Sequence, residues 1–421
     1  WWLTVKKKNI YWRLCLDSVG AFVTQTTPTT RTMHHSAAND SRNCMDRRST
    51  LLAESFPALI GPSLPSKYRE PRPLGRGASS TVWTLIDNVT NEIVVGKLCN
   101  LALMSEKNKS FARSEAVNIL SCEHPNIIRL LGTYERNEQL LHILEYADAG
   151  DLQTQVEVRA KHYSRVKNGN GPALRKDAAE VVPCYYKENE VLVILAQLCL
   201  AVKYIHGKNI MHRDLKTSNI FLRKNGLIKL GDFGFSRQYG QSLSSDVGKT
   251  FCGTPYYLSP ELWRRENYGH KADIWSMGVL LYEVMALRKP FTSPNMEKLM
   301  QCVLTEGSYE LLPRERYSQG LCDLCYAMLR VNAHERPNIT EILATPIMLN
   351  EGLRHLKTNL LRLRGIEEAV KNRLVWEVDS VQRAFCATPA LHTPSSVQAE
   401  QKKAHSSIND EGGAAMDSSV V

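Results

Sequence analysis

Two short polar stretches, each following an apolar run, constrain this chain more than any other feature. The stretch His212–Asn219 places an acid, a cation and an amide in one loop. The stretch Gly231–Gly234 comes next and sets a second carboxylate beside glycine. Two carboxylates, an amide and a lysine are the groups that phosphoryl transfer from a metal-bound nucleotide requires. The two stretches therefore indicate a site for nucleotide-dependent phosphoryl transfer.

These stretches resemble the catalytic loop and the metal-binding turn of the eukaryotic protein kinases. The resemblance implies that Asp214 accepts or orients the proton of the acceptor hydroxyl. It implies that Lys216 neutralises charge on the transferred phosphoryl group. It also implies that Asn219 and Asp232 hold Mg²⁺, with Mn²⁺ as an alternative, through the hard oxygen ligands that such ions prefer.

The resemblance covers residues 68–348 and implies the bilobal α+β fold of protein kinases. The small β-rich N-lobe is expected at 68–145 and the larger helical C-lobe at 146–348. The segment 164–187 is longer than kinases usually have between the flanking helices, and its Asn, Gly and Pro residues predict a surface insertion. Residues 1–67 lack sustained periodicity and are expected to be mostly disordered.

A glycine-containing stretch, Leu74–Trp83, resembles the loop that covers the phosphates in kinases, and Leu140–Tyr146 resembles the strand that leads into the hinge. By resemblance, the residues that bind ATP are Leu74, Gly75, Gly77, Val82, Val95, Lys97, Glu145, Ala147, Asp151 and Phe221. Glu115 lies in a helix predicted from Phe111 to Leu120 and is expected to pair with Lys97 and orient it. Asp151 has an alternative role as a helix N-cap.

Some residues depart from the usual kinase pattern. Ser80 stands where the third glycine of the phosphate-covering loop is usual. Val95 replaces a small alanine near the adenine, and Gly96 replaces an apolar residue. These departures leave the affinity for the nucleotide open.

The position of Lys216 after the catalytic aspartate resembles the serine/threonine kinases. The segments Lys249–Glu261 and Asn219–Leu222 resemble those of the NIMA-related kinases. On that likeness Thr250 is the expected site of activating phosphorylation. Arg213 is expected to anchor the phosphate by charge-assisted pairing.

Two buried pairings in the C-lobe follow from the same resemblance. Asp273 is expected to hold the catalytic loop from inside the lobe. Arg336 is expected to pair with the carboxylate of Glu261. Both duties are structural, and the alternative for each is an ordinary ion pair at the surface.

Beyond residue 348, apolar residues recur at helical spacing: Leu353, Leu356, Leu360, Leu363, Ile366, Val370, Leu374, Val378, Val381 and Phe385. The pattern predicts an amphipathic helical tail over 349–386 with Gly365 as its weak point. The helix of 353–385 either docks on the kinase domain or forms a short coiled coil for self-association. Residues 387–421 are small and polar and are expected to be disordered.

The amino-acid composition indicates the class of protein and its expected place in the cell. Hydrophobic residues at 43% and charged residues at 23% are ordinary for a soluble globular protein. The 11 cysteines show no disulfide-framework spacing, so we expect an intracellular, cytoplasmic protein, with cytoskeletal or nuclear association left open. The apolar run Ile274–Leu287 contains Glu283 and is too short to span a membrane. The first methionine is Met33, and we expect residues 1–32 to be upstream sequence or an error in the gene boundaries.

The expected activity is transfer of the γ-phosphoryl group of ATP to serine or threonine hydroxyls of protein substrates. Two alternatives stay open. A pseudokinase scaffold would bind partners without catalysis, but the retained polar residues argue against it. A nucleic-acid-binding protein would use the net charge of +10, but the sequence contains no recognised nucleic-acid module.

Overall fold

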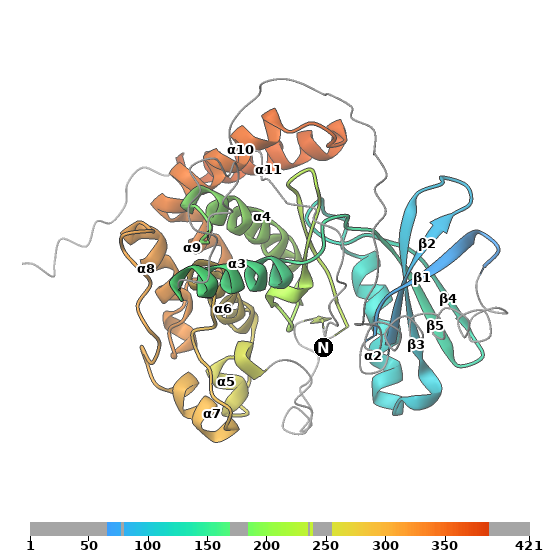
Figure 1. Cartoon of the computed structure of the whole chain (residues 1–421), viewed down its shortest axis with the longest axis horizontal. Helices are drawn as coiled ribbons and strands as arrows, with labels where there is room; N and C mark the ends of the chain where they lie inside the picture. Colours follow the sequence, from blue (N-terminus) through green and yellow to red (C-terminus); the bar gives the residue numbers. More distant parts are fainter. Residues whose placement is uncertain (1–64, 77–79, 169–183, 235, 239–254, 387–421) are drawn as a thin grey trace, which may run out of the picture. The chain divides into compact units, whose positions relative to one another are not determined.

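The computed structural model describes residues 65–76, 80–168, 184–234, 236–238 and 255–386 (Figure 1). Several predicted features lie outside these residues: Gly77, Thr250, the 169–183 part of the insertion and the two termini expected to be disordered. The described residues up to Val378 belong to one compact unit, and a second unit starts at Asp379.

The N-lobe is a five-stranded antiparallel sheet with one long helix, as predicted for the kinase fold. The strand order is β1-β2-β3-β5-β4, and α2 lies beside the sheet (Figure 1). The elements are β1 (Tyr68–Arg76), β2 (Ser80–Asp87), β3 (Ile93–Asn100), a 3₁₀ turn (Leu101–Leu103), α2 (Glu106–Leu120), β4 (Leu130–Arg136) and β5 (Gln139–Glu145).

The two faces of the sheet have different roles, because side chains alternate along each strand. Trp83, Leu85, Val94, Leu98, Leu141 and Ile143 are buried together with Tyr68 and form the core of the lobe. Val82 pairs with Lys97, and Val95 pairs with Leu144 across the neighbouring strands. Residues that are directly opposite on paired strands share a face. Val82, Val95 and Lys97 therefore lie on the face opposite the core.

The core face explains the unusual Gly96. A Cβ atom at this position would lie 2.9 Å from Cδ1 of Leu85 and 3.3 Å from Cδ1 of Leu141. The space beside this position is thus occupied by Leu85. The glycine is part of the packing of the lobe and does not leave a hole beside Lys97.

We predict that Gly96→Ile, which restores an apolar residue, lowers the free energy of unfolding by about 1–3 kcal/mol, because it overpacks the core. Urea denaturation followed by tryptophan fluorescence measures the change. Leu85→Ala combined with Gly96→Ile should be less destabilising than the sum of the two single variants, since the smaller residue makes room. Val89→Ile, at a position that is 80% exposed, is the control. A Gly96→Ile protein as stable as the wild type would contradict this account.

Helix α2 starts at Glu106, which corrects the predicted start at Phe111. The side chain of Ser105 accepts a hydrogen bond from the backbone N–H of Asn108 and caps the first turn. The turn before Phe111 is polar, so apolar periodicity did not reveal it. Serine at the N-cap is the sequence feature that marks the true start.

The C-lobe is mainly helical, with two short two-stranded sheets that flank the catalytic loop and the turn after it. Its elements are α3 (Leu152–Lys167), α4 (Glu188–Gly207), β6 (Ile210–Met211), β7 (Ile220–Leu222), β8 (Ile228–Leu230), β9 (Arg237–Gln238), α5 (Pro260–Trp263), α6 (His270–Ala286), α7 (Met296–Leu304), α8 (Gln319–Met328) and α9 (Ile339–Ala344). Strand β6 pairs with β9, and β7 pairs with β8.

Helices α4 and α6 form the centre of this lobe, and most residues on both are buried. Among the described residues, α4 is the helix long and apolar enough to cross a membrane, whereas the most apolar run singled out in the sequence, and judged too short to span, was Ile274–Leu287. Its most apolar window is 83% buried inside the fold. An all-round apolar helix of this kind fits the core of a large lobe.

The predicted insertion, 164–187, begins too early, whereas its end at 187 agrees with the start of the next helix. Helix α3 continues to Lys167, and α4 begins at Glu188. Just before α4, Tyr186 is buried and the guanidinium of Arg159 stacks 3.9 Å from the centre of its ring. These residues are part of the packed lobe, so the segment without described structure is shorter than predicted.

The predicted tail helix is divided in two, α10 (Leu353–Arg362) and α11 (Glu368–Cys386), after a π-helical turn at Met348–Gly352. The break is at Gly365, which has φ +75° and was expected to be the weak point. Leu353, Leu356 and Leu360 are buried, and α10 packs against α4. Docking on the kinase domain, one of the two predicted alternatives, is therefore present for α10.

Candidate active site

Lys97 lies between two carboxylates that come from different parts of the chain. Its Nζ is 2.7 Å from Oε1 of Glu115 on α2 and 3.0 Å from Oδ1 of Asp232 after β8. Burial lowers the pKa of Lys97, but the two carboxylates outweigh this and raise it well above its usual value. The positive charge of Lys97 lowers the pKa of Asp232, against the opposite effect of burial. Lys97 therefore stays positively charged and Asp232 negatively charged at neutral pH.

The catalytic loop places Asp214, Lys216 and Asn219 together. Oδ2 of Asp214 is 2.7 Å from Nζ of Lys216 and accepts a hydrogen bond of 2.9 Å from Nδ2 of Asn219. The same amide nitrogen donates to the backbone carbonyl of Asp214. Burial raises the pKa of Asp214, and the Lys216 ammonium opposes that rise. The carboxylate is thus fixed in orientation by two donors before any substrate arrives.

Asp273 of α6 holds the backbone of this loop, in the geometry expected from the sequence. Its carboxylate accepts hydrogen bonds from the backbone N–H of His212 at 2.9 Å and of Arg213 at 2.8 Å. His206 donates a third bond at 2.9 Å. Arg213 has φ +69°, a left-handed conformation that a residue with a side chain adopts only when its surroundings enforce it. The buried carboxylate provides that enforcement.

Arg336 and Glu261 form the other predicted pairing. Nη1 and Nη2 of Arg336 lie 2.8 Å and 2.7 Å from the two oxygens of Glu261. The remaining N–H groups of Arg336 donate to the carbonyls of Arg330, Lys271 and Val331. Burial raises the pKa of Glu261, but Arg336 outweighs it and the pKa is lowered.

The residues expected around the nucleotide occupy the N-lobe and the start of the C-lobe. Leu74 and Gly75 lie on β1, and Phe221 lies on β7. A Cβ atom on Gly231 would lie 2.7 Å from the Phe221 ring and 3.1 Å from Ile128, so only glycine fits between them. This lack of space explains why the residue before Asp232 is a glycine.

Glu145 in the hinge has partners that the sequence did not reveal. Its Oε1 lies 2.7 Å from Nζ of Lys229 on β8, and its backbone N–H donates to the carbonyl of Arg129 at 3.0 Å, so its contact with the adenine stays a prediction. Ala147 follows and is half-buried. Asp151 caps α3, where it accepts 2.8 Å and 2.9 Å bonds from the backbone and hydroxyl of Thr154. The N-cap role of Asp151 is observed, and its contact with the ribose stays a prediction.

One group near the catalytic loop was missed. Oγ1 of Thr217 is 3.1 Å from the hydroxyl of Tyr257 and donates to Glu283 at 3.0 Å. Tyr257 also donates to Glu283, and Lys289 pairs with Glu283 at 2.7 Å. This cluster ties the catalytic loop to α6 and to the end of the activation segment. The available clue was Glu283 itself, an acid inside an apolar helix.

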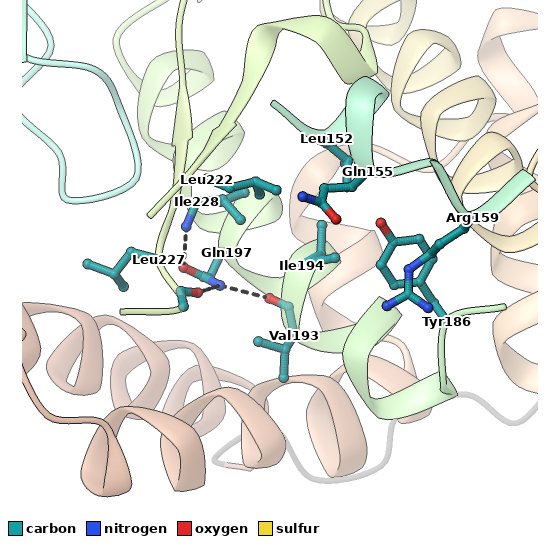
Figure 2. Close-up of a pocket in the computed structure, with 11 residues that line it drawn as sticks. Leu152, Gln155, Arg159, Tyr186, Val193, Ile194, Gln197, Leu222, Leu227 and Ile228 are labelled. Atoms are coloured by element: carbon teal, nitrogen blue, oxygen red, sulfur yellow. Dashed lines mark hydrogen bonds between the residues drawn. The ribbon is translucent and has the colours of Figure 1, made fainter. Parts of the chain in front are cut away.

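A small cavity lies away from these residues, between α3, α4 and the β7–β8 hairpin (Figure 2). Its volume is about 40 Å³, whereas ligand pockets usually measure about 300–1,000 Å³. Figure 2 shows Gln197 at its edge, bonded to Val193 and to the backbone of Ile228. The cavity is too small for a nucleotide, so the candidate active site is the cluster of residues around Lys97 and Asp214.

The oxygen ligands at this site suit a metal ion that also binds the phosphates of a nucleotide. Among the described residues, no cluster of three or more His, Cys, Asp and Glu side chains could hold a metal. Asp232 contributes a carboxylate, and the bonded amide nitrogen of Asn219 identifies its Oδ1 as the available acceptor. One or two protein oxygens completed by substrate phosphates is the usual arrangement for Mg²⁺ in kinases.

The comparisons with known proteins agree with this geometry. The family model described as "Protein kinase domain" matches residues 68–348. The chain is 38% identical over 333 residues to "Putative serine/threonine-protein kinase A" of Trypanosoma brucei brucei, covering 78% of this chain and 72% of that protein. It is 33% identical over 323 residues to mouse Nek2, covering 74% of this chain and 67% of Nek2. Mouse Nek5 matches at 32% over 276 residues, 65% of this chain and 39% of Nek5.

Protein kinases act on protein substrates and use ATP with a divalent metal, which agrees with a site that contains two lysines, three acids and an amide. The bilobal fold and the matched domain establish the kinase family, and the names of the relatives establish the kind of acceptor. The similarity to Nek2 and Nek5 agrees with the likeness seen in the activation segment. This chain therefore belongs to the NIMA-related family of serine/threonine protein kinases.

Proposed function

We propose that the kinase uses Mg²⁺ with ATP, that Asp214 orients the acceptor hydroxyl, and that phosphorylation of Thr250 controls activity. The observation that carries the proposal is the position of Lys97, which contacts Glu115 and Asp232 at once. Through these two contacts, Lys97 on β3 links the N-lobe sheet to α2 and to the turn that carries Asp232. Glu115 orients Lys97 toward the α- and β-phosphates, a role known for such pairs in kinases.

The residues of the catalytic loop act mainly by position and charge. Asp214 accepts the proton of the serine or threonine hydroxyl through Oδ1, since both recorded bonds from described residues go to Oδ2. Lys216 neutralises charge that develops on the phosphoryl group. Bound Mg²⁺ supplies further neutralisation of the phosphate charge. Asn219 and Asp232 hold the ion in place with oxygen ligands.

The metal assignment predicts that Asp232→Asn weakens binding of ATP in the presence of Mg²⁺ by about tenfold or more, by analogy with losses at other metal sites. Calorimetric titration with ATP, with and without Mg²⁺, measures the effect. Asp323→Asn, an exposed acid on α8, is the matched control. The wild type should bind more tightly when Mg²⁺ is added. Equal effects of Mg²⁺ on wild type and Asp232→Asn would reject the assignment.

The proposal for Thr250 is supported by Arg213, whose backbone N–H donates to Asp273 and whose guanidinium carbon lies 5.5 Å from the centre of the Tyr268 ring. A guanidinium binds a phosphate through charge-assisted, often bidentate hydrogen bonds. We predict that Thr250→Ala lowers kcat about tenfold or more, with Thr250→Ser close to wild type. Kinetic assays on β-casein, together with mass spectrometry of the segment, test this. Full activity of Thr250→Ala in unphosphorylated and phosphorylated preparations alike would remove the proposal.

A further inference from the structure

Helix α11 contacts the loop that joins α2 to β4, although the two are separated by about 250 residues. The guanidinium of Arg373 donates a 2.7 Å hydrogen bond to the backbone carbonyl of Glu123 and lies 5.8 Å from the ring of Tyr204 on α4. The Tyr204 hydroxyl in turn accepts the N–H of Glu123 at 3.1 Å. Both backbone groups of Glu123 are therefore bonded, one through α4 and the other through α11.

The second contact is made by Glu377, one turn later on α11. Nδ1 of His124 accepts the N–H of Asn126 at 3.0 Å, which assigns the ring proton to Nε2. Nε2 then donates to Oε2 of Glu377 at 2.8 Å. The side chain of His124 is 0% exposed and that of Glu377 is 17% exposed. We call these residues, with Arg373, Glu123 and Tyr204, the tail clasp.

Hydrogen bonds connect the loop held by the tail clasp to strand β8. Asn126 accepts the N–H of Leu230 at 2.8 Å, and its side chain donates to Gln197 and to the carbonyl of Ile228. Figure 2 shows the side chain of Gln197, which accepts a hydrogen bond from the backbone N–H of Ile228. Ile128 donates to the carbonyl of Leu230. The loop held by the tail clasp is thus bonded along β8, which leads directly to Asp232.

The same loop is the C-terminal anchor of α2. Helix α2 ends at Leu120, just before the tail clasp, and carries Glu115. Asn118 on this helix donates 2.9 Å bonds to the carbonyl and hydroxyl of Ser236, beyond Asp232. The position of α2 therefore depends on the loop at its end and on the segment after β8, and the tail clasp holds the first of these.

We propose that Arg373 and Glu377 are positioning residues of this kinase: they fix the loop after α2 and so keep Glu115 aligned with Lys97 and Asp232. Both residues lie outside the 68–348 span that the kinase family model matches. The proposal rests on the role proposed above for Glu115. It makes α11 a working part of the catalytic unit, so that the kinase domain alone is less active than the full chain.

The test compares Glu377→Ala with wild type in the full chain. We expect kcat on β-casein to fall by about three- to tenfold, with KM for β-casein unchanged, because the variant shifts a coupled element rather than a substrate contact. Hydrogen–deuterium exchange should rise in α2 and in residues 121–128 but stay unchanged in α6. Glu377→Gln keeps an acceptor for His124 and should recover most of the activity. Glu368→Ala, on the same helix and paired only three residues away with Lys371, is the matched control.

Three results would overturn the proposal. The first is a Glu377→Ala protein with the kcat of the wild type. The second is a rise of exchange in α2 with no fall in kcat. The third is an equal rise of exchange in α2 and α6, which is a general loss of stability. Glu115→Gln, measured alongside, separates this failure from that of the proposed function. A fully active Glu115→Gln would refute the role of Glu115, whereas a defective Glu115→Gln beside an unaffected Glu377→Ala would refute the tail clasp alone.

Discussion

Asp214→Asn is expected to lower kcat by about 10²–10⁴-fold, the usual contribution of a positioned acid or base. The substitution keeps the size of the side chain but removes the charge and the ability to accept a proton. Nζ of Lys216 and Nδ2 of Asn219 now both bond to Oδ2 of Asp214. In the variant, the amide oxygen takes the place of Oδ2 as a weaker, uncharged acceptor for both donors, and the NH₂ group takes the place of Oδ1, where it cannot accept a proton.

The proposed control by Thr250 requires that wild type and variant be compared in the same phosphorylation state of the activation segment. Both proteins are therefore first treated with a small amount of tagged wild-type kinase, which is then removed. Transfer of labelled phosphate to β-casein is then compared. Asp323→Asn makes the same chemical change at an exposed site on α8 and should stay at wild-type activity. Equal transfer by wild type and Asp214→Asn would mean that Asp214 is not needed for the chemistry.

The pH dependence follows from the same contacts. Burial raises the pKa of Asp214, and Lys216 counteracts part of that rise. Because the ionised form is the active one, kcat/KM falls as the pH drops through this raised pKa. Removing the ammonium in Lys216→Met takes away the opposing effect, so the pKa rises further and the acidic limb moves to higher pH.

The sequence predicted the residues of the active site well because the chemistry of phosphoryl transfer restricts the residue type at each position. Lys97, Glu115 and Asp232 are far apart in the chain, and each is the residue type that a phosphate, lysine or metal ion demands. The structure brings them within hydrogen-bonding distance. The pairing of Arg336 with Glu261 was implied by the family resemblance, and the structure shows it buried, where a charge requires a specific partner.

Features that depend on packing could not be predicted in the same way. Gly96 departs from the family pattern, and only the position of Leu85 across the sheet explains it. The contact of His124 with Glu377 joins residues 253 positions apart and has no local pattern. The start of α2 was misplaced because its first turn has no apolar stripe, whereas its N-cap Ser105 was a local clue that periodicity ignores.

Arg336→Ala should lower the free energy of unfolding by about 3–5 kcal/mol, the range for breaking a buried ion pair from one side. The variant leaves the Glu261 carboxylate without its bidentate partner and frees the carbonyls of Arg330, Lys271 and Val331. Arg336 is 0% exposed at its side chain, so water cannot replace these bonds. Urea denaturation measures the change in free energy.

Arg288→Ala is the control for Arg336→Ala, because Arg288 pairs with Glu310 at the surface and such pairs contribute about 0–1 kcal/mol. Replacing Arg336 and Glu261 together with methionine should recover part of the loss, since no buried charge is then left alone. The folded-state pKa of Glu261 is lowered, so the stabilisation by the pair is complete above about pH 5, near the unfolded pKa, and is lost as the pH falls through the lower folded value. An Arg336→Ala protein within 1 kcal/mol of wild type, roughly the limit for surface pairs, would show that the pair does not hold the lobe together.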